Sequence, residues 1–119
     1  MRSTLLLASL ALAACSDQSP PSVNGTWVAT KLAATYTMIL SEQDAVVMGS
    51  GQYDNSAARF HTTYTVAGSY HSPGVALVFT YATSGSSQFS ADYTSGNAMS
   101  GIVAVSPGGG ADTLVFVKQ

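Results

Sequence analysis

Apolar and polar residues alternate from Thr26 to the end of the chain, and this period of two limits the fold more than any other feature. Successive side chains of a β-strand point to opposite faces, so an alternating run predicts a strand with one buried face. From Thr26 on, no stretch repeats apolar residues with the 3.6-residue period of a helix over enough residues to predict one. The eight predicted strands cover residues 26–32, 35–42, 45–53, 59–71, 74–83, 87–94, 98–105 and 112–118.

Short segments rich in Gly, Pro, Asn and Ser separate these runs, for example Ser72-Pro73-Gly74 and Ser84-Gly85-Ser86. Connections this short join antiparallel neighbours, because a parallel pair needs a long crossover. We therefore predict an all-β domain, an eight-stranded antiparallel up-and-down barrel, whose closure removes exposed sheet edges. A two-sheet β-sandwich is the alternative. Glycines inside the strands suit the curvature of a barrel: Gly49, Gly51, Gly68 and Gly101.

The alternation also predicts which side chains point inward. In residues 59–71 the predicted outward face is polar and carries His61, Thr63, Thr65, Ala67, Ser69 and His71. The last strand is ambiguous, because Leu114 and Phe116 form one apolar face and Val115 and Val117 the other. The inward set is Tyr36, Met38, Leu40, Phe60, Thr62, Tyr64, Val66, Val75, Leu77, Phe79, Tyr81, Phe89, Ala91, Tyr93, Met99, Gly101 and Val103.

The first fifteen residues have the composition of a secretory signal. Arg2 precedes an apolar run from Leu5 to Ala14, which is shorter than the roughly 20 residues that span a bilayer. The run ends in Leu12-Ala13-Ala14-Cys15, which resembles the lipobox of bacterial lipoproteins and contains the only cysteine of the chain. The resemblance implies that residues 1–14 are removed as a signal peptide and that Cys15 carries diacylglycerol and a further acyl chain such as palmitate. Two or more acyl chains anchor a protein stably to a membrane.

An ordinary signal peptide, cut after Ala13 or Ala14 to leave Cys15 as a free thiol, is the alternative. Ser16, rather than aspartate, follows the cysteine, and in the lipoprotein pattern this favours the outer membrane, with the domain facing the periplasm or, alternatively, the cell surface. Ser16 to Asn24 is polar and proline-bearing, which predicts an extended linker with nothing to bury. The expected organisation is thus a signal peptide (1–14), a lipidated cysteine with a flexible tether (15–25) and a barrel domain (26–119).

The sparse charge excludes several classes of partner. The chain has four Lys and Arg residues, six Asp and Glu residues and a net charge of −2. Nucleic acids and anionic lipid surfaces both require clustered basic residues, so neither is expected as a partner, and the membrane contact is expected through the covalent lipid only. A membrane-spanning barrel is rejected because its lipid-facing side chains would be apolar. The predicted outward set instead includes His61, Thr63, Thr65, Ser69, Ser90, Asp92 and Thr94.

Gly25-Thr26-Trp27 resembles the Gly-x-Trp opening of the first strand in lipocalins and avidins, the calycin group of barrels. Gly49-x-Gly51-x-Tyr53 and Val66-Ala67-Gly68-x-Tyr70 are similar to avidin strands. The resemblance implies that Trp27 plugs the closed end of the barrel. Biotin-binding members line their site with several tryptophans, whereas Trp27 is the only one here, so the resemblance is carried over to architecture and not to biotin.

No catalytic or metal-binding motif is found, and neither an enzyme activity nor a cofactor is expected. His61 and His71 are ten residues apart, about 33 Å along one strand, too far to share a site. Asp54, Asp92 and Asp112 are scattered. Pro107-Gly108-Gly109-Gly110 lacks the lysine and helix that follow a phosphate-binding loop and is expected to be a turn.

The inward tyrosines are the one feature that points to binding, because a buried phenol hydroxyl needs a partner. They either line a ligand pocket near the barrel mouth or fill the interior, since eight strands enclose a space that side chains alone can fill. We expect a non-catalytic envelope module that binds a small apolar or aromatic ligand or serves a structural role. The alternative is a protein-interaction module, such as a periplasmic inhibitor of proteases or lysozymes. The candidate ligand-lining residues are Tyr36, Met38, Tyr64, Phe79, Tyr81 and Tyr93.

Overall fold

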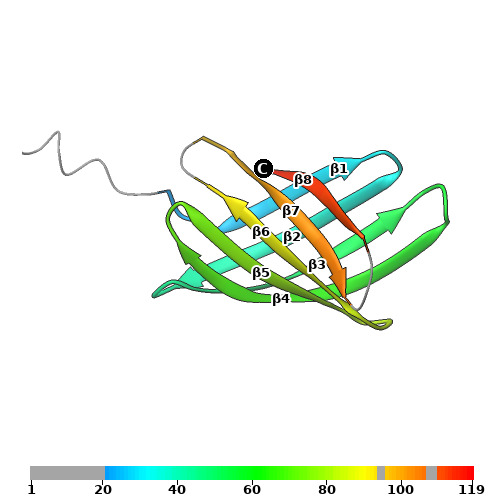
Figure 1. Cartoon of the computed structure of the whole chain (residues 1–119), viewed down its shortest axis with the longest axis horizontal. Helices are drawn as coiled ribbons and strands as arrows, with labels where there is room; N and C mark the ends of the chain where they lie inside the picture. Colours follow the sequence, from blue (N-terminus) through cyan, green and yellow to red (C-terminus); the bar gives the residue numbers. More distant parts are fainter. Residues whose placement is uncertain (1–20, 94–95, 107–109) are drawn as a thin grey trace, which may run out of the picture.

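The computed structural model describes residues 21–93, 96–106 and 110–119. Its eight strands form one closed barrel in which each strand pairs antiparallel with its neighbours in sequence order (Figure 1). The up-and-down barrel is therefore confirmed over the sandwich. The strand boundaries lie within two residues of the predicted ones. The strands are β1 (Gly25–Lys31), β2 (Ala34–Gln43), β3 (Val46–Asn55), β4 (Phe60–His71), β5 (Gly74–Tyr81), β6 (Ser86–Asp92), β7 (Ala98–Ser106) and β8 (Ala111–Lys118).

Several expectations concern residues outside the described ranges. These are the signal peptide with Cys15, Thr94 at the end of one expected strand, and the glycine-rich turn from Pro107 to Gly109. Among the described residues, no helix is long and apolar enough to cross a membrane.

The interior of the barrel is filled by the alternate residues that the sequence assigns to it. Phe79 and Phe89 stack with ring centroids 6.1 Å apart, and Phe116 meets Phe89 edge-on at 5.2 Å. All three rings are fully buried, which confirms the predicted inward face of β5 and β6. The ambiguity of β8 is also resolved, since Leu114 and Phe116 face inward while nearly half of the Val115 surface is exposed.

Phe60 is the one predicted inward residue that is wrong, because 43% of its surface is exposed. It is the first residue of β4 and lies opposite Asn55 of β3. The ladder between β4 and β5 begins only at Tyr64, so the start of β4 has a neighbour on one side only. Phe60 instead packs on the ring of Tyr53 at 6.2 Å. It has the right parity for the interior but lies beyond the end of the barrel wall.

One end of the barrel is closed around Trp27, which is fully buried. Its indole Nε1–H donates a hydrogen bond to the Val23 carbonyl at 2.9 Å, and its ring meets Tyr93 edge-on at 5.2 Å. The Tyr70 hydroxyl donates to the Pro21 carbonyl at 2.9 Å. Val23 itself is fully buried. The expectation of a tether with nothing to bury is therefore wrong for its last residues, which cover this end of the barrel.

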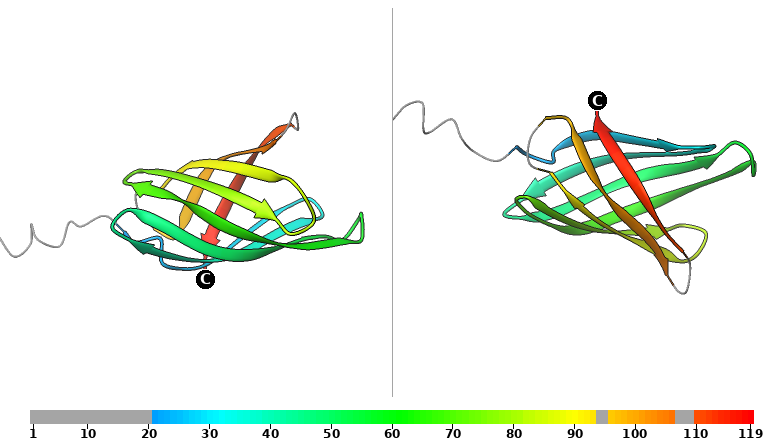
Figure 2. Two further views of the ribbon diagram at one scale, coloured as in Figure 1. Left: turned by 90° about the horizontal axis from the view of Figure 1, so that it is seen from below. Right: turned by 45° about the horizontal axis from the view of Figure 1, so that its top comes forward.

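At the other end the barrel wall opens. The ladder between β1 and β8 has two register pairs, Trp27 with Lys118 and Val28 with Val117, whereas the ladder between β2 and β3 has ten. Figures 1 and 2 show the β3–β4 hairpin extending away from β7 and β8 at this end. We call this end the mouth. It is formed by the end of β1 and the start of β2, the end of β3 and the start of β4, the end of β5 and the start of β6, and the end of β7 and the start of β8.

Candidate binding site at the barrel mouth

A pocket of about 480 Å³ lies in the mouth, between the β1–β2 turn, the end of β3, the end of β7 and the start of β8. This volume falls within the range of small-molecule sites, which are usually concave and mainly apolar with a few polar groups. Apolar side chains and two phenol rings make up most of the wall. The lining residues are Lys31, Leu32, Ala33, Ala34, Tyr36, Tyr53, Asn55, Ala57, Val103, Val105, Gly110, Asp112 and Leu114.

Two tyrosines form the aromatic part of this mouth pocket. The rings of Tyr36 and Tyr53 lie 4.9 Å apart. Tyr36 also contacts Phe116, at 6.1 Å, and so separates the pocket from the filled core. The Tyr53 hydroxyl accepts a hydrogen bond from Asn55 Nδ2 at 3.2 Å. The mouth pocket therefore offers flat apolar surface together with phenol and amide groups for hydrogen bonding.

The charged groups among the lining residues neutralise each other. Lys31 Nζ donates to Asp112 Oδ1 at 2.5 Å, to the Thr113 carbonyl at 3.1 Å and to Thr113 Oγ1 at 3.0 Å. Lys31 thereby lowers the pKa of the Asp112 carboxyl, helped by the Thr113 backbone N–H. These bonds cross from β1 to β8 where the two strands no longer pair. The rim is held together by a neutral ion pair, which favours an uncharged ligand.

The rim also exposes apolar side chains. Leu32, in the β1–β2 turn, is 97% exposed and has a φ of 54°, a conformation that is costly for a leucine. Val105, on β7, is 48% exposed although it follows the inward alternation of Met99 and Val103. The exposed leucine and valine extend the apolar wall of the mouth pocket outward.

The structure separates the six candidate ligand-lining residues. Tyr36 lines the mouth pocket, and Tyr81 lies half-buried, with its hydroxyl 2.9 Å from Ser87 Oγ. Met38 and Phe79 are fully buried in the core, where they line no part of the mouth. Tyr93 packs against Trp27 at the closed end. Tyr64 is buried, and its hydroxyl donates to the Thr37 carbonyl at 3.1 Å.

Sequence reasoning missed Tyr53, Leu32 and Val105. The signal for Tyr53 was present, because it continues the inward alternation of Val47, Gly49 and Gly51. Leu32 lies in a turn, where alternation has no meaning. Lys31 contributed only to the net charge, since nothing in the sequence indicates that β1 and β8 separate beside it.

The histidines and carboxylates do not assemble into a reactive centre in the described part of the chain. His61 Nδ1 pairs with Asp54 Oδ1 on the outer face of the β3–β4 hairpin, and both side chains are about half exposed. Among the described residues, no group of three His, Cys, Asp or Glu side chains lies close enough to hold a metal ion.

Burial raises the pKa of Tyr36, Tyr64 and Tyr81 above the ordinary value of about 10. Below pH 10 these phenols are protonated in both the folded and the unfolded chain. Above it, the unfolded chain releases their protons first, so the free energy of unfolding falls as the pH rises towards the folded-state pKa. We expect urea midpoints to decrease above pH 10. The ultraviolet phenolate signal of the folded protein should show part of its tyrosines titrating late, and six tyrosines titrating together near pH 10 would contradict this expectation.

Comparison of the chain with protein-family models, with curated proteins and with solved structures found no match.

Proposed function

We propose that this protein is a non-catalytic, lipid-anchored protein of the bacterial cell envelope whose barrel mouth binds a small, uncharged ligand with an apolar or aromatic body. The observation that carries the proposal is the mouth pocket of about 480 Å³, with Tyr36 and Tyr53 side by side in its wall. The filled core beneath limits the ligand to the mouth. The Lys31–Asp112 pair leaves the rim without a net charge that would attract an ionic ligand.

The direct test is a titration with p-cresol and indole, two neutral aromatic probes, with benzoate as a charged control. We expect the neutral probes to shift amide resonances of the β1–β2 turn and of β7 in a nuclear magnetic resonance (NMR) spectrum, and benzoate to shift them less. Equal shifts with benzoate would contradict a site that selects uncharged ligands.

Blocking the mouth should abolish this binding. Val105→Trp places an indole in the mouth pocket at a half-exposed position, so it can be accommodated without repacking the core. We expect the affinity for p-cresol to fall at least about tenfold, a loss of about 1.4 kcal/mol of binding free energy. Val115→Trp is the matched control, because Val115 is 49% exposed on the outer face of β8. Equal affinities of Val105→Trp and Val115→Trp for p-cresol would rule out the mouth pocket as the binding site.

The proposed lipid anchor at Cys15 is supported by the sequence alone and needs its own experiment. If Cys15 carries the acyl groups, the mature protein should partition with membranes, incorporate a palmitate analogue and have a mass that includes the lipid. Cys15→Ala should remove the label and release the protein from the membrane fraction. An unmodified protein with a free Cys15 thiol would favour the ordinary signal peptide.

The outer wall favours a second candidate, a protein-interaction module. Met48, Ala67 and Val78 lie opposite one another on β3, β4 and β5, and Met48 is 60% exposed. Val46 on β3 is 55% exposed beside them. Apolar patches of this kind often mark protein contacts. If the protein inhibits a protease or lysozyme, Met48→Lys should abolish inhibition and Val105→Trp should not. If it binds a small ligand in the mouth, Val105→Trp should abolish p-cresol binding and Met48→Lys should not.

A further inference from the structure

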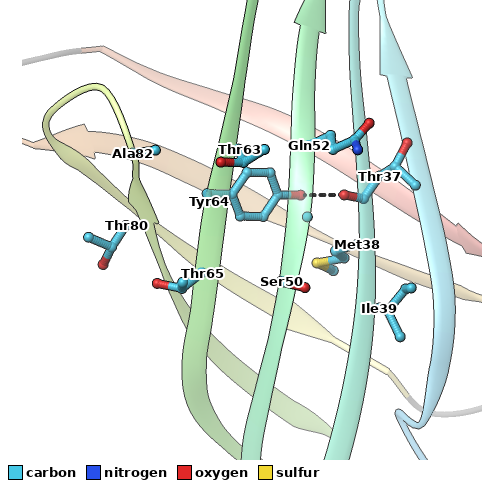
Figure 3. Close-up of a pocket in the computed structure, with 11 residues that line it drawn as sticks. Thr37, Met38, Ile39, Ser50, Gln52, Thr63, Tyr64, Thr65, Thr80 and Ala82 are labelled. Carbon is cyan, nitrogen blue, oxygen red and sulfur yellow. Dashed lines mark hydrogen bonds between the residues drawn. The ribbon is translucent and has the colours of Figure 1, made fainter.

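A second hollow, of about 460 Å³, lies on the outer wall of the barrel across β2, β3, β4 and β5 (Figure 3). We call it the outer groove. It is separate from the mouth pocket and shares no residue with it. Its rim consists of outward side chains in two rows that follow from the register of the sheet. One row is Thr37, Gln52, Thr63 and Ala82, and the other is Ile39, Ser50, Thr65 and Thr80.

A row of inward residues forms the floor between these two rows. Met38, Gly51 and Tyr64 lie opposite one another on β2, β3 and β4. The Tyr64 ring occupies the space that a side chain on Gly51 would need, since a Cβ there would lie 2.6 Å from Tyr64 Cζ and 2.2 Å from the Thr37 carbonyl oxygen. Gly51 therefore brings the backbone close to its neighbours. The floor of the outer groove thus lies at a close contact within the sheet and not in a surface loop.

The rim presents hydroxyl and amide groups without a formal charge. Thr37, Ser50, Thr63, Thr65 and Thr80 each carry a hydroxyl that both donates and accepts hydrogen bonds, and Gln52 adds an amide. Within the described part of the chain, no hydrogen bond of 3.5 Å or less involves the side-chain oxygens of Thr63, Thr65 or Thr80. These groups are available to a ligand.

The rim side chains are also preorganised before a ligand binds. Threonine has a branched Cβ that restricts its side-chain rotation. Facing positions on paired strands lie about 5 Å apart and alternate positions along a strand about 7 Å apart. Fixing such side chains on a ligand therefore costs less conformational entropy than ordering long flexible ones. The result is a preformed grid of hydroxyls that spans four strands, about 14 Å in all.

We propose that the outer groove binds a neutral oligosaccharide laid across β2 to β5. A sugar chain matches the grid, because it carries closely spaced hydroxyls that donate and accept in turn, and its C–H faces can contact Ile39 and Ala82. Ionic ligands match it poorly. The nearest ionisable pair along the register, Asp54 with His61, lies one alternate position beyond Gln52 and Thr63, and its two side chains already contact each other.

The test uses the full-length protein with maltohexaose, cellotetraose and chitotetraose as neutral probes and oligogalacturonate as the anionic control. We expect at least one neutral probe at millimolar concentration to shift the NMR resonances of Thr63, Thr65 and Thr80, and the anionic probe to have little effect. No shift in the outer groove with any of the three neutral probes overturns the proposal. Stronger shifts with oligogalacturonate also overturn it, as does a sugar that shifts the mouth residues instead.

Two double variants test whether the hydroxyls bind the sugar. In each of them valine, which has nearly the volume of threonine, replaces two threonines. Thr63→Val with Thr65→Val removes two hydroxyls from the rim and leaves the shape of the outer groove unchanged. We expect it to weaken binding of the active sugar at least about tenfold, equal to about 1.4 kcal/mol. Thr26→Val with Thr30→Val on β1 is the control and should change the affinity less than twofold. Equal affinities of the two double variants would contradict the proposal.

The two binding sites are independent in this test. Val105→Trp in the mouth should leave sugar binding intact, and the Thr63, Thr65 double variant should leave p-cresol binding intact. A failure of the mouth site therefore does not imply a failure of the outer groove. If both variants lose both ligands while their circular dichroism spectra stay native, the assignment of separate sites is wrong.

Discussion

Replacing Trp27 with alanine is expected to lower the free energy of unfolding by about 3–5 kcal/mol, the range for large aromatic truncations in a packed core. The indole is fully buried, contacts Tyr93 edge-on and bonds to the Val23 carbonyl, so its removal leaves a cavity and frees the segment that covers the barrel end. Urea unfolding followed by circular dichroism measures the change.

Trp27→Phe is the control that separates volume from hydrogen bonding. It keeps an aromatic ring but loses the Nε1–H donor, so the buried Val23 carbonyl loses its partner at a cost of about 1–3 kcal/mol. An alanine variant that loses less than about 1 kcal/mol would mean that the barrel end is not packed around Trp27.

Replacing Phe79 with alanine is expected to be just as damaging, at about 3–5 kcal/mol. Its ring is fully buried and lies within 6.4 Å of the ring centroids of Tyr36, Tyr64, Phe89 and Phe116, which makes it the centre of the aromatic core. The cavity left by the phenyl ring would be surrounded by other rings that cannot easily collapse.

Phe60→Ala is the matched comparison, because Phe60 is the same residue type on the predicted inward face of its strand yet is 43% exposed beyond the barrel wall. We expect a loss of only about 1 kcal/mol, from the contact with the Tyr53 ring. Similar losses from the two phenylalanines would contradict the position of the barrel end, and a small loss from Phe79→Ala would contradict the closed core.

The fold could be predicted because the alternation is a local property that a single strand displays on its own. The inward faces of β5 and β6 followed from the parity of Phe79 and Phe89 alone. The alternation along one strand does not show where the neighbouring strand ends, and for this reason Phe60 was wrongly predicted to face inward. The pairing length of two strands depends on residues far apart in the sequence, such as Tyr64 and Tyr81.

The candidate site was harder to predict for the same reason. The tyrosines were correctly expected to face inward, but their height in the barrel determines their role. Tyr36 reaches the mouth, whereas Tyr93 lies at the closed end and Tyr64 lies under the outer groove. The separation of β1 from β8, which leaves Lys31 to bridge to Asp112, has no signature in either strand. Burial of Val23 was also hidden, because a single apolar residue in a polar segment sets up no pattern.

The central functional claim is that the mouth holds a small neutral ligand against the wall that Tyr36 and Tyr53 form. Nuclear Overhauser effects between bound p-cresol and the protein test it most directly, since they report proximity atom by atom. We predict contacts from the probe to Tyr53, Leu32, Val103 and Val105. Contacts confined to the outer wall, or none in a sample saturated with p-cresol, would contradict the claim.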